Sequence, residues 1–178
     1  MPEFNIAAVF KKGVTTTYKG IEIDLTNPDV TDVTIEDIAH SLSLLCRWNG
    51  TSENFFSVAE HSVMVAELLP PSSRLGGLMH DSEESILGDN ISPLKEIVPE
   101  LVTIGNELRT KIIDKFDIYY DHMLIKRADR EQLKWEYNNV IIGKKKGLSP
   151  KAAERLFLRK FKEYLKYNKI VIAMTDGF

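Results

Sequence analysis

The change of hydrophobic period along the chain is the feature that most constrains its fold. Only residues 14–25 alternate as β-strands do, with β-branched residues before Lys19-Gly20 and an alternating segment after it. From about residue 34 onward, apolar side chains recur at helical spacing. We therefore predict an all-α fold with a small N-terminal β-hairpin.

Local signals mark where several of the helices begin and end. Thr34 and Asp37 resemble a capping box, Pro70-Pro71 and Gly88 are stop signals, and Ser149-Pro150 is a start signal. Pro93 opens a further short turn. The spacing predicts one helix after Thr34, one after Ser149, and helices over residues 56–69, 73–87, 101–116 and 121–142. With no linker or repeat, we expect residues 1–178 to form a single domain, with residues 1–34 as a hairpin extension.

Composition excludes several classes of protein. A net charge of −3 does not provide the basic surface that nucleic acids or anionic membranes require. Cys46 is the single cysteine, so no internal disulfide can form and a reducing compartment is expected. No segment has the pattern of a signal peptide or a membrane-spanning helix. We expect a cytoplasmic protein with neither nucleic-acid nor membrane partners.

Two histidines and two aspartates carry the strongest chemical signal. His61, the adjacent pair His80-Asp81, and Asp129 come from three predicted helices, and the chain has only 4 histidines. Two imidazole nitrogens and two carboxylate oxygens can hold one divalent transition metal and leave positions for water and substrate. This donor set suits Co, Zn, Mn, Fe or Ni. Glu84 lies on the same predicted helical face as His80 and adds a carboxylate.

Each of these residues also has an ordinary structural interpretation. His61 lies between apolar positions and can be a buried histidine bonded to backbone groups. Asp129 lies at helical spacing from Ile125 and Leu133, on a predicted core-facing stripe, and can pair with a basic neighbour such as Lys126. The segment around His80 can be a solvated acidic patch. Taken singly, none of them decides between a metal site and structure.

The order of these residues resembles the HD superfamily of metal-dependent phosphohydrolases. The resemblance spans roughly residues 35–165 and includes residues 57–62, residues 78–84, Gly88-Asp89 and Pro93–Lys95. These segments are most similar to the branch that contains bacterial deoxyribonucleoside 5′-monophosphatases and the phage dATP triphosphohydrolases that accompany 2-aminoadenine genomes. The resemblance implies an HD-domain helical bundle. The N-terminal extension and His40 depart from that pattern.

The resemblance also implies roles for individual residues. His61, His80, Asp81 and Asp129 would ligate one metal ion, and Glu84 would act on the attacking water or the leaving oxygen. The implied substrate-binding residues are Arg47, Trp48, Asp89, Lys95 and Lys126. Trp48 can equally be core packing. His40 can be a surface or hydrogen-bonding histidine.

Three functions remain open at this point. Arg47, Lys95 and Lys126 carry more positive charge than a monophosphate needs, which favours a triphosphate, with dATP cleaved to deoxynucleoside and triphosphate and an additional Mg²⁺ on the triphosphate. The alternative is a deoxyribonucleoside 5′-monophosphatase. A lesser alternative is a non-catalytic nucleotide-binding module. In each case we expect a nucleotide ligand, a homo-oligomer (a dimer or a multiple of it), and a host-cytoplasm location if a phage encodes the chain.

Overall fold

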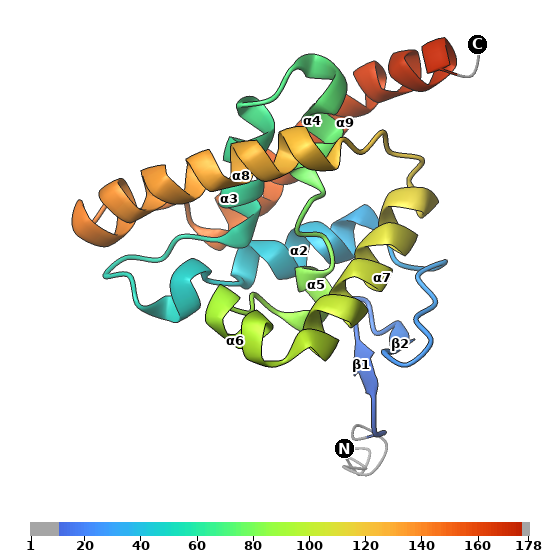
Figure 1. The fold of residues 1–178 in the computed structure, drawn as a ribbon, viewed down its shortest axis with the longest axis horizontal. Coiled ribbons are helices and arrows are strands. Elements are labelled where there is room, and N and C mark those ends of the chain that lie inside the picture. The colour runs from blue at the N-terminus through green and yellow to red at the C-terminus, as the bar shows by residue number, and fades with distance from the viewer. Residues whose placement is uncertain (1–10, 176–178) are drawn as a thin grey trace.

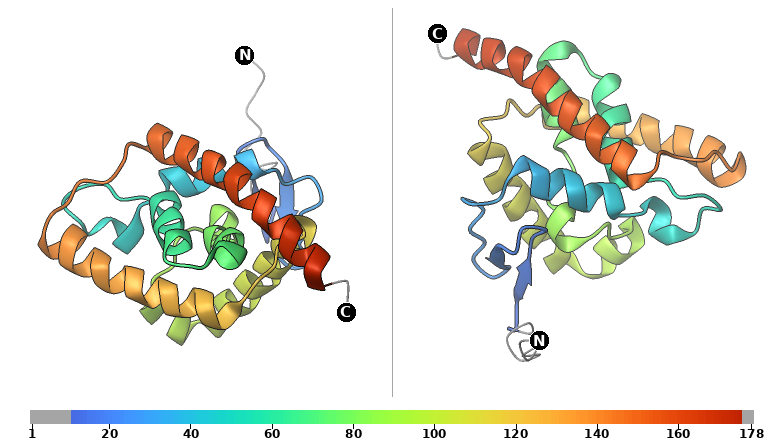
Figure 2. Two further views of the ribbon diagram at one scale, coloured as in Figure 1. Left: turned by 90° about the horizontal axis from the view of Figure 1, so that it is seen from above. Right: turned by 180° about the vertical axis from the view of Figure 1, so that it is seen from behind.

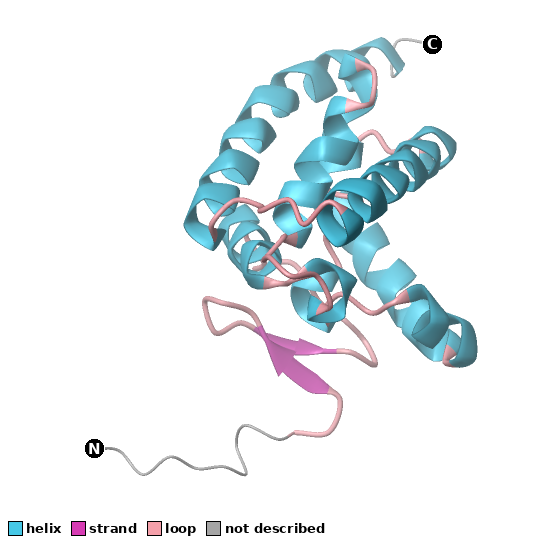
Figure 3. Ribbon diagram, turned by 90° about the vertical axis from the view of Figure 1, so that its left-hand side faces the viewer, coloured by secondary structure: helices cyan, strands magenta, loops and turns pink. Residues whose placement is uncertain are grey.

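The structure, a computed structural model, describes the backbone of residues 11–175 and the side chains of residues 11–168. A two-stranded antiparallel sheet lies at the end of the molecule that carries the N-terminus (Figure 3). It pairs β1 (Val14–Thr16) with β2 (Glu22–Asp24). The predicted hairpin is confirmed, while residues 1–10 of the predicted extension lie outside the described residues.

The hairpin contacts the first described helix through apolar packing and through hydrogen bonds. Ile23 of β2 is fully buried in the main core. Helix α2 (Ile35–Leu44) begins with the predicted capping box, in which Asp37 N–H donates to Thr34 Oγ1 and Thr34 N–H donates to Asp37 Oδ2. The other oxygen of Asp37 accepts from Lys19 N–H at 2.8 Å. One side chain therefore caps α2 and fixes the hairpin turn against it.

Seven further α-helices follow α2 in the described part of the chain. In chain order they are α3 (Val58–Glu67), α4 (Arg74–Leu78), α5 (Glu84–Leu87), α6 (Ser92–Ile97), α7 (Pro99–Lys115), α8 (His122–Glu136) and α9 (Pro150–Thr175). Figure 1 shows α6 and α7 at the hairpin end of the molecule. In Figure 2, α8 and α9 run along opposite sides, and α3, which packs on both, lies between them. None of the described helices is both long and apolar enough to cross a bilayer.

The main core forms where α9 packs against α2, α3 and α4. Phe157 and Tyr164 of α9 are among its largest fully buried side chains. A smaller cluster, formed by Val65, Leu69, Ile125 and Ala128, joins α3 to α8. These two clusters hold α3 in a fixed position between its neighbours, which matters because α3 carries His61.

The predicted helix over residues 73–87 is wrong, because the segment is two short helices joined by a turn. Helix α4 ends at Leu78 and α5 begins at Glu84. Between them, Ser82 N–H donates to Met79 O and Glu84 N–H donates to Asp81 O, as in consecutive tight turns. His80 and Asp81 therefore lie on a turn rather than on a helical face.

Two glycines explain the close packing of α4. A Cβ atom at Gly77 would lie 2.3 Å from Leu69 Cδ1 and 3.2 Å from Ala66 Cα on the α3 side. A Cβ atom at Gly76 would lie 2.8 Å from the carbonyl oxygen of Tyr119. Glycine also weakens the helix. The pair thus lets α4 approach its neighbours and favours an early helix end.

The predicted helix over residues 121–142 is present, but its buried stripe differs from the prediction. Helix α8 continues into a π-helix, Tyr137–Ile142. Leu133, which the spacing placed in the core, is 39% exposed. The buried positions of α8 are Ile125, Ala128, Gln132 and Glu136. Two polar residues on this stripe therefore face the interior of the protein.

Candidate metal centre

Helix α3 places the first imidazole in the interior. The side chain of Ser57 accepts from Glu60 N–H and caps α3, whose buried face includes His61. His61 is fully buried, and its Nδ1 atom lies 2.6 Å from Glu136 Oε1. An ionised carboxylate only accepts hydrogen bonds, so Nδ1 carries the proton and the lone pair of Nε2 is free.

The turn after α4 places the second imidazole opposite the first. His80 Nδ1 lies 2.8 Å from the carbonyl oxygen of Gly77, which also only accepts. Its Nε2 atom lies 3.3 Å from His61 Nε2. Two ring nitrogens that both present lone pairs repel each other unless a proton or a metal cation lies between them. The backbone and Glu136 thus hold both rings in the tautomer that a metal requires.

Two carboxylates complete the group of acceptors. Asp81 Oδ2 lies 3.5 Å from His61 Nε2 and 3.2 Å from His80 Nε2. Asp129 Oδ1 lies 3.2 Å and 3.8 Å from the same two nitrogens. Donor atoms of His61, His80 and Asp81 all lie within 4.8 Å of one another, as metal ligands do. The donor set therefore fits one divalent transition metal.

The electrostatics of these groups favour a cation at their centre. Burial opposes charge on His80, but Asp81 and Asp129 outweigh it and raise the pKa of His80 well above its usual value. Burial likewise opposes charge on Asp81, but His80 and His61 hold its pKa below its usual range. Among the described residues, Asp129 forms its ion pairs with the two histidines rather than with Lys126 or another basic neighbour. The structural alternative for Asp129 is therefore not the arrangement observed.

A cavity of about 460 Å³ opens beside this group of four side chains. Its lining residues are Arg47, Trp48, Asn49, Thr51, Asp81, Glu84, Asp89, Asn90, Ile91, Ser92, Pro93, Lys95, Asp129 and Leu133. This volume lies within the range of small-molecule sites. The lining thus places two of the candidate metal-binding carboxylates, a guanidinium and an indole around one cavity.

The wall formed by Arg47 and Trp48 has an unusual backbone. Both residues lie in the 3-10 turn Arg47–Gly50 that follows α2. Trp48 has φ 59° and Asn49 has φ 52°, in the left-handed region that a bulky residue rarely adopts. Such a conformation persists only where other contacts enforce it.

Glu84 borders the cavity as a buried acid. Its Oε1 atom accepts from Lys95 Nζ at 3.2 Å, and its Oε2 atom has no hydrogen-bond partner among the described residues. Burial, with Asp81 and Asp89 nearby, raises the pKa of Glu84 well above its usual value, and Lys95 offsets only part of this. A carboxyl group of this kind can carry a proton near neutral pH.

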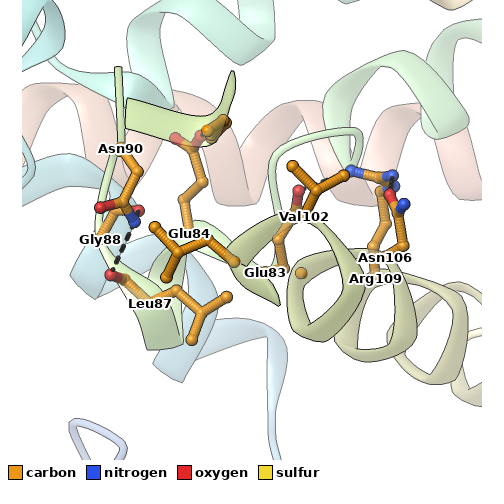
Figure 4. Close-up of a pocket in the computed structure, with 11 residues that line it drawn as sticks. Glu83, Glu84, Leu87, Gly88, Asn90, Val102, Asn106 and Arg109 are labelled. Atoms are coloured by element: carbon orange, nitrogen blue, oxygen red, sulfur yellow. Dashed lines mark hydrogen bonds and ion pairs between the residues drawn. The ribbon is translucent and has the colours of Figure 1, made fainter. Parts of the chain in front are cut away.

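Glu84 also lines a second, smaller cavity of about 70 Å³ behind the site. Figure 4 shows Glu83 beside Asn106 and Arg109 in this cavity, with Glu84 on its other side. Arg109 Nη1 donates to Glu83 Oε1 at 2.6 Å. Glu83 is therefore held by α7 and faces away from the larger cavity, whereas Glu84 separates the two.

The structure brings together most of the residues predicted to bind substrate. Arg47, Trp48, Asp89 and Lys95 line the larger cavity, and Arg47 Nη1 lies 3.7 Å from Asp89 Oδ2. Lys126 is exposed on α8 and is not part of that lining. His40 stacks on Tyr18 and lies 3.6 Å from Glu154, also outside the lining, as its structural interpretation predicts.

Sequence reasoning missed Glu136, the most highly connected carboxylate of the site. It is fully buried and lies beside His61, Gln132, Arg47 and Trp48. Its position seven residues after Asp129 places both on neighbouring parts of the α8 surface. A charged residue on a core-facing stripe is the available signal, but the spacing of the apolar residues predicts a stripe through Leu133 instead.

Comparison with known proteins gives partial matches. No family model matches the chain. An uncharacterized protein of Rhodobacter capsulatus is 43% identical over 88 residues, which cover 44% of this chain and 45% of that protein. The uncharacterized protein YfdR of Escherichia coli is 36% identical over 87 residues, 49% of each chain. The chain spans about half the length of the curated relatives it matches.

Proposed function

We propose that the protein is a metal-dependent phosphohydrolase of the HD type that acts on deoxyribonucleotides. One observation carries the proposal: four acceptor atoms converge at the edge of a cavity that a guanidinium, an indole and a buried carboxyl group also line. A bound divalent metal supplies Lewis acidity, which lowers the pKa of water and neutralises phosphoryl charge.

The residues of the chain then have separable tasks. Arg47 and Lys95 place positive charge in the cavity to hold phosphoryl oxygens, and Trp48 offers a flat apolar surface for a sugar or a base. Asp89 can accept from a sugar hydroxyl. In the reaction, a water oxygen bonds to the α-phosphorus and the bond from phosphorus to the 5′-oxygen breaks. Glu84 accepts the proton of the water or donates one to the leaving 5′-oxygen.

The same bond is cleaved whether the substrate is a triphosphate or a monophosphate. The triphosphate proposal, with dATP as substrate, depends on cations beyond Arg47. Lys126 lies outside the cavity lining, and Lys95 is already paired with Glu84. This observation favours the second candidate, a deoxyribonucleoside 5′-monophosphatase, because fewer free cations face the cavity than a triphosphate tail would engage.

Chromatography of the products from dATP and dAMP tests both candidates. Each nucleotide would be incubated with protein loaded with Co²⁺, Mn²⁺ or Zn²⁺. Inorganic triphosphate from dATP supports the triphosphohydrolase, and turnover confined to dAMP supports the monophosphatase. Binding of nucleotide without turnover under every metal would contradict an enzyme and leave the non-catalytic module.

A further inference from the structure

We propose that Glu136 is a positioning residue that couples metal binding at His61 to the order of the cavity wall formed by Arg47 and Trp48. This inference rests on the proposed metal site. It assigns to one buried carboxylate the task of holding a metal ligand and a substrate wall at the same time.

The two oxygens of Glu136 face different parts of the site. Oε1 lies 2.6 Å from His61 Nδ1 and accepts from Gln132 Nε2 at 3.2 Å. Oε2 accepts from Trp48 Nε1 at 3.0 Å and from Arg47 Nε at 3.3 Å. One oxygen thus contacts the metal-ligating imidazole and the other contacts the cavity wall.

The conformation of the cavity wall depends on the hydrogen bonds that Glu136 Oε2 accepts. Trp48 has a left-handed backbone conformation, which is strained for a bulky side chain and persists only under external constraint. The indole meets Tyr137 at a ring separation of 6.1 Å, and its only polar atom donates to Glu136. The carboxylate is therefore the polar contact that holds the indole in place.

A carboxylate is required because donors face both of its oxygens. Indole and guanidinium groups can only donate hydrogen bonds. A metal on Nε2 of His61 obliges Nδ1 to carry the proton and to donate as well. Glutamine in place of Glu136 has one oxygen and one NH₂ group, so it can accept on one side only. Gln132 does not restrict the choice, since its own amide can turn.

In Glu136→Gln, metal-bound His61 and the wall formed by Arg47 and Trp48 should therefore both require the single amide oxygen. Without metal, neutral His61 can accept at Nδ1, and the amide oxygen can stay with Trp48 and Arg47. With metal, the amide oxygen must face His61, and the NH₂ group then opposes the donors of the wall. Metal binding would disturb Trp48 in the variant and leave it undisturbed in the parent.

Fluorescence of Trp48 measures this coupling directly. Trp135→Phe removes the other tryptophan and serves as the background protein. Zn²⁺ is the probe, because its filled d shell avoids paramagnetic quenching, and a chromophoric chelator reports its affinity. In the background protein we expect Trp48 emission to stay constant through Zn²⁺ saturation. After Glu136→Gln, the emission should shift in step with saturation, and the Zn²⁺ affinity should fall by about 10- to 100-fold.

Two further variants keep the test decisive. Gln132→Met removes a donor to Oε1 without touching the wall, so its Trp48 emission should remain unresponsive to Zn²⁺. If Glu136→Gln does not fold, Trp48→Phe relieves Oε2 of one donor and should raise the Zn²⁺ affinity several-fold, since the carboxylate becomes a stronger acceptor for His61.

Emission that responds equally in the background protein and in Glu136→Gln overturns the coupling, as does unchanged affinity in Trp48→Phe. Zn²⁺ that fails to bind the background protein overturns the metal site itself, and the coupling with it.

Discussion

Two buried glutamates on opposite sides of the site respond to burial in opposite ways. Burial raises the pKa of Glu136 on α8, but His61, Arg47 and Gln132 outweigh it and bring the net value below the usual one. Burial also raises the pKa of Glu84 on α5, where Asp81 and Asp89 add to the shift. The α8 carboxylate stays charged, and the α5 carboxyl group takes up a proton readily.

The difference lies in the number of donors, since both side chains are almost completely buried. Glu136 contacts donors with both oxygens, whereas one oxygen of Glu84 has no partner within the part of the chain that the structure describes. A carboxylate whose lone pairs are all engaged serves as a scaffold, because moving it would leave several buried donors unpaired. A carboxyl group with a free oxygen can still exchange a proton. Glu136, on the α8 side of the site, is thus suited to holding neighbouring side chains in place. Glu84, on the α5 side, is suited to exchanging a proton in a reaction.

The largest effect is expected at Asp81, which lies between the two sides. Asp81→Ala removes one of the four acceptors and should abolish metal content and turnover together. Because Asp81 lies on a turn, the helix content measured by circular dichroism should stay close to that of the parent. Asp114→Ala, an exposed change on α7, is the matched control and should keep both properties. Full activity in Asp81→Ala would remove it from the site.

The α5 side should respond in rate and leave metal binding intact. Glu84→Gln should keep the metal and lower kcat by about 10²- to 10⁴-fold, the usual contribution of a general acid or base. Since the pKa of Glu84 is raised, the parent should show a pH limb at higher pH than an ordinary glutamate gives, and the variant should lack it. Glu96→Gln on the exposed face of α6 is the control. Metal loss in Glu84→Gln would contradict the division between the two sides.

The raised pKa of Glu83 predicts how the free energy of unfolding of the metal-free protein changes with pH. Burial, with a contribution from Asp81, raises the pKa of Glu83 from 4.5 to about 7, and Arg109 offsets only part of this. The folded state then binds a proton that the unfolded state releases, so the free energy of unfolding should fall as pH rises from about 4.5 to 7. Urea unfolding at several pH values measures this slope, and Glu83→Gln should reduce it. An unchanged slope would contradict the shift.

The smallest effect is expected at Lys126. It is exposed and outside the cavity lining, so Lys126→Ala should leave stability within about 0.5 kcal/mol of the parent and leave KM for dAMP and dATP unchanged. Lys95→Ala, on α6, should raise KM, because Lys95 lines the cavity. A rise in KM for dATP alone in Lys126→Ala would restore this lysine to the substrate site and support the triphosphate.

The elements that local signals determine could be predicted from the sequence. The capping box of Thr34 and Asp37 and the hairpin around Lys19-Gly20 depend on neighbours within a few residues, and both are present. The turn that carries His80-Asp81 differs from the predicted helix. Gly76-Gly77 weakens the helix locally, but the close approach of Gly77 to Ala66 and Leu69 is a tertiary contact that the sequence pattern does not show.

The donor set could be proposed from residue types and order, but the supporting residues could not. Glu136 meets His61 across 75 positions of sequence and Trp48 across 88. Its neighbours in the chain give no sign of these contacts. Lys126 is the reverse case: the resemblance implies that it binds phosphate, whereas its side chain is exposed and outside the cavity lining.

The glycine pair at the start of the site also limits how the chain can vary. A single methyl group at Gly77 would meet Leu69 and the α3 backbone, and α3 carries one imidazole while the turn after α4 carries the other. Gly77 contributes no side chain, yet the lack of a Cβ atom allows α4 to approach α3, and its carbonyl oxygen lies 2.8 Å from His80 Nδ1. A design that transfers this site to another helical scaffold would need glycine at both of these positions as well as the two histidines.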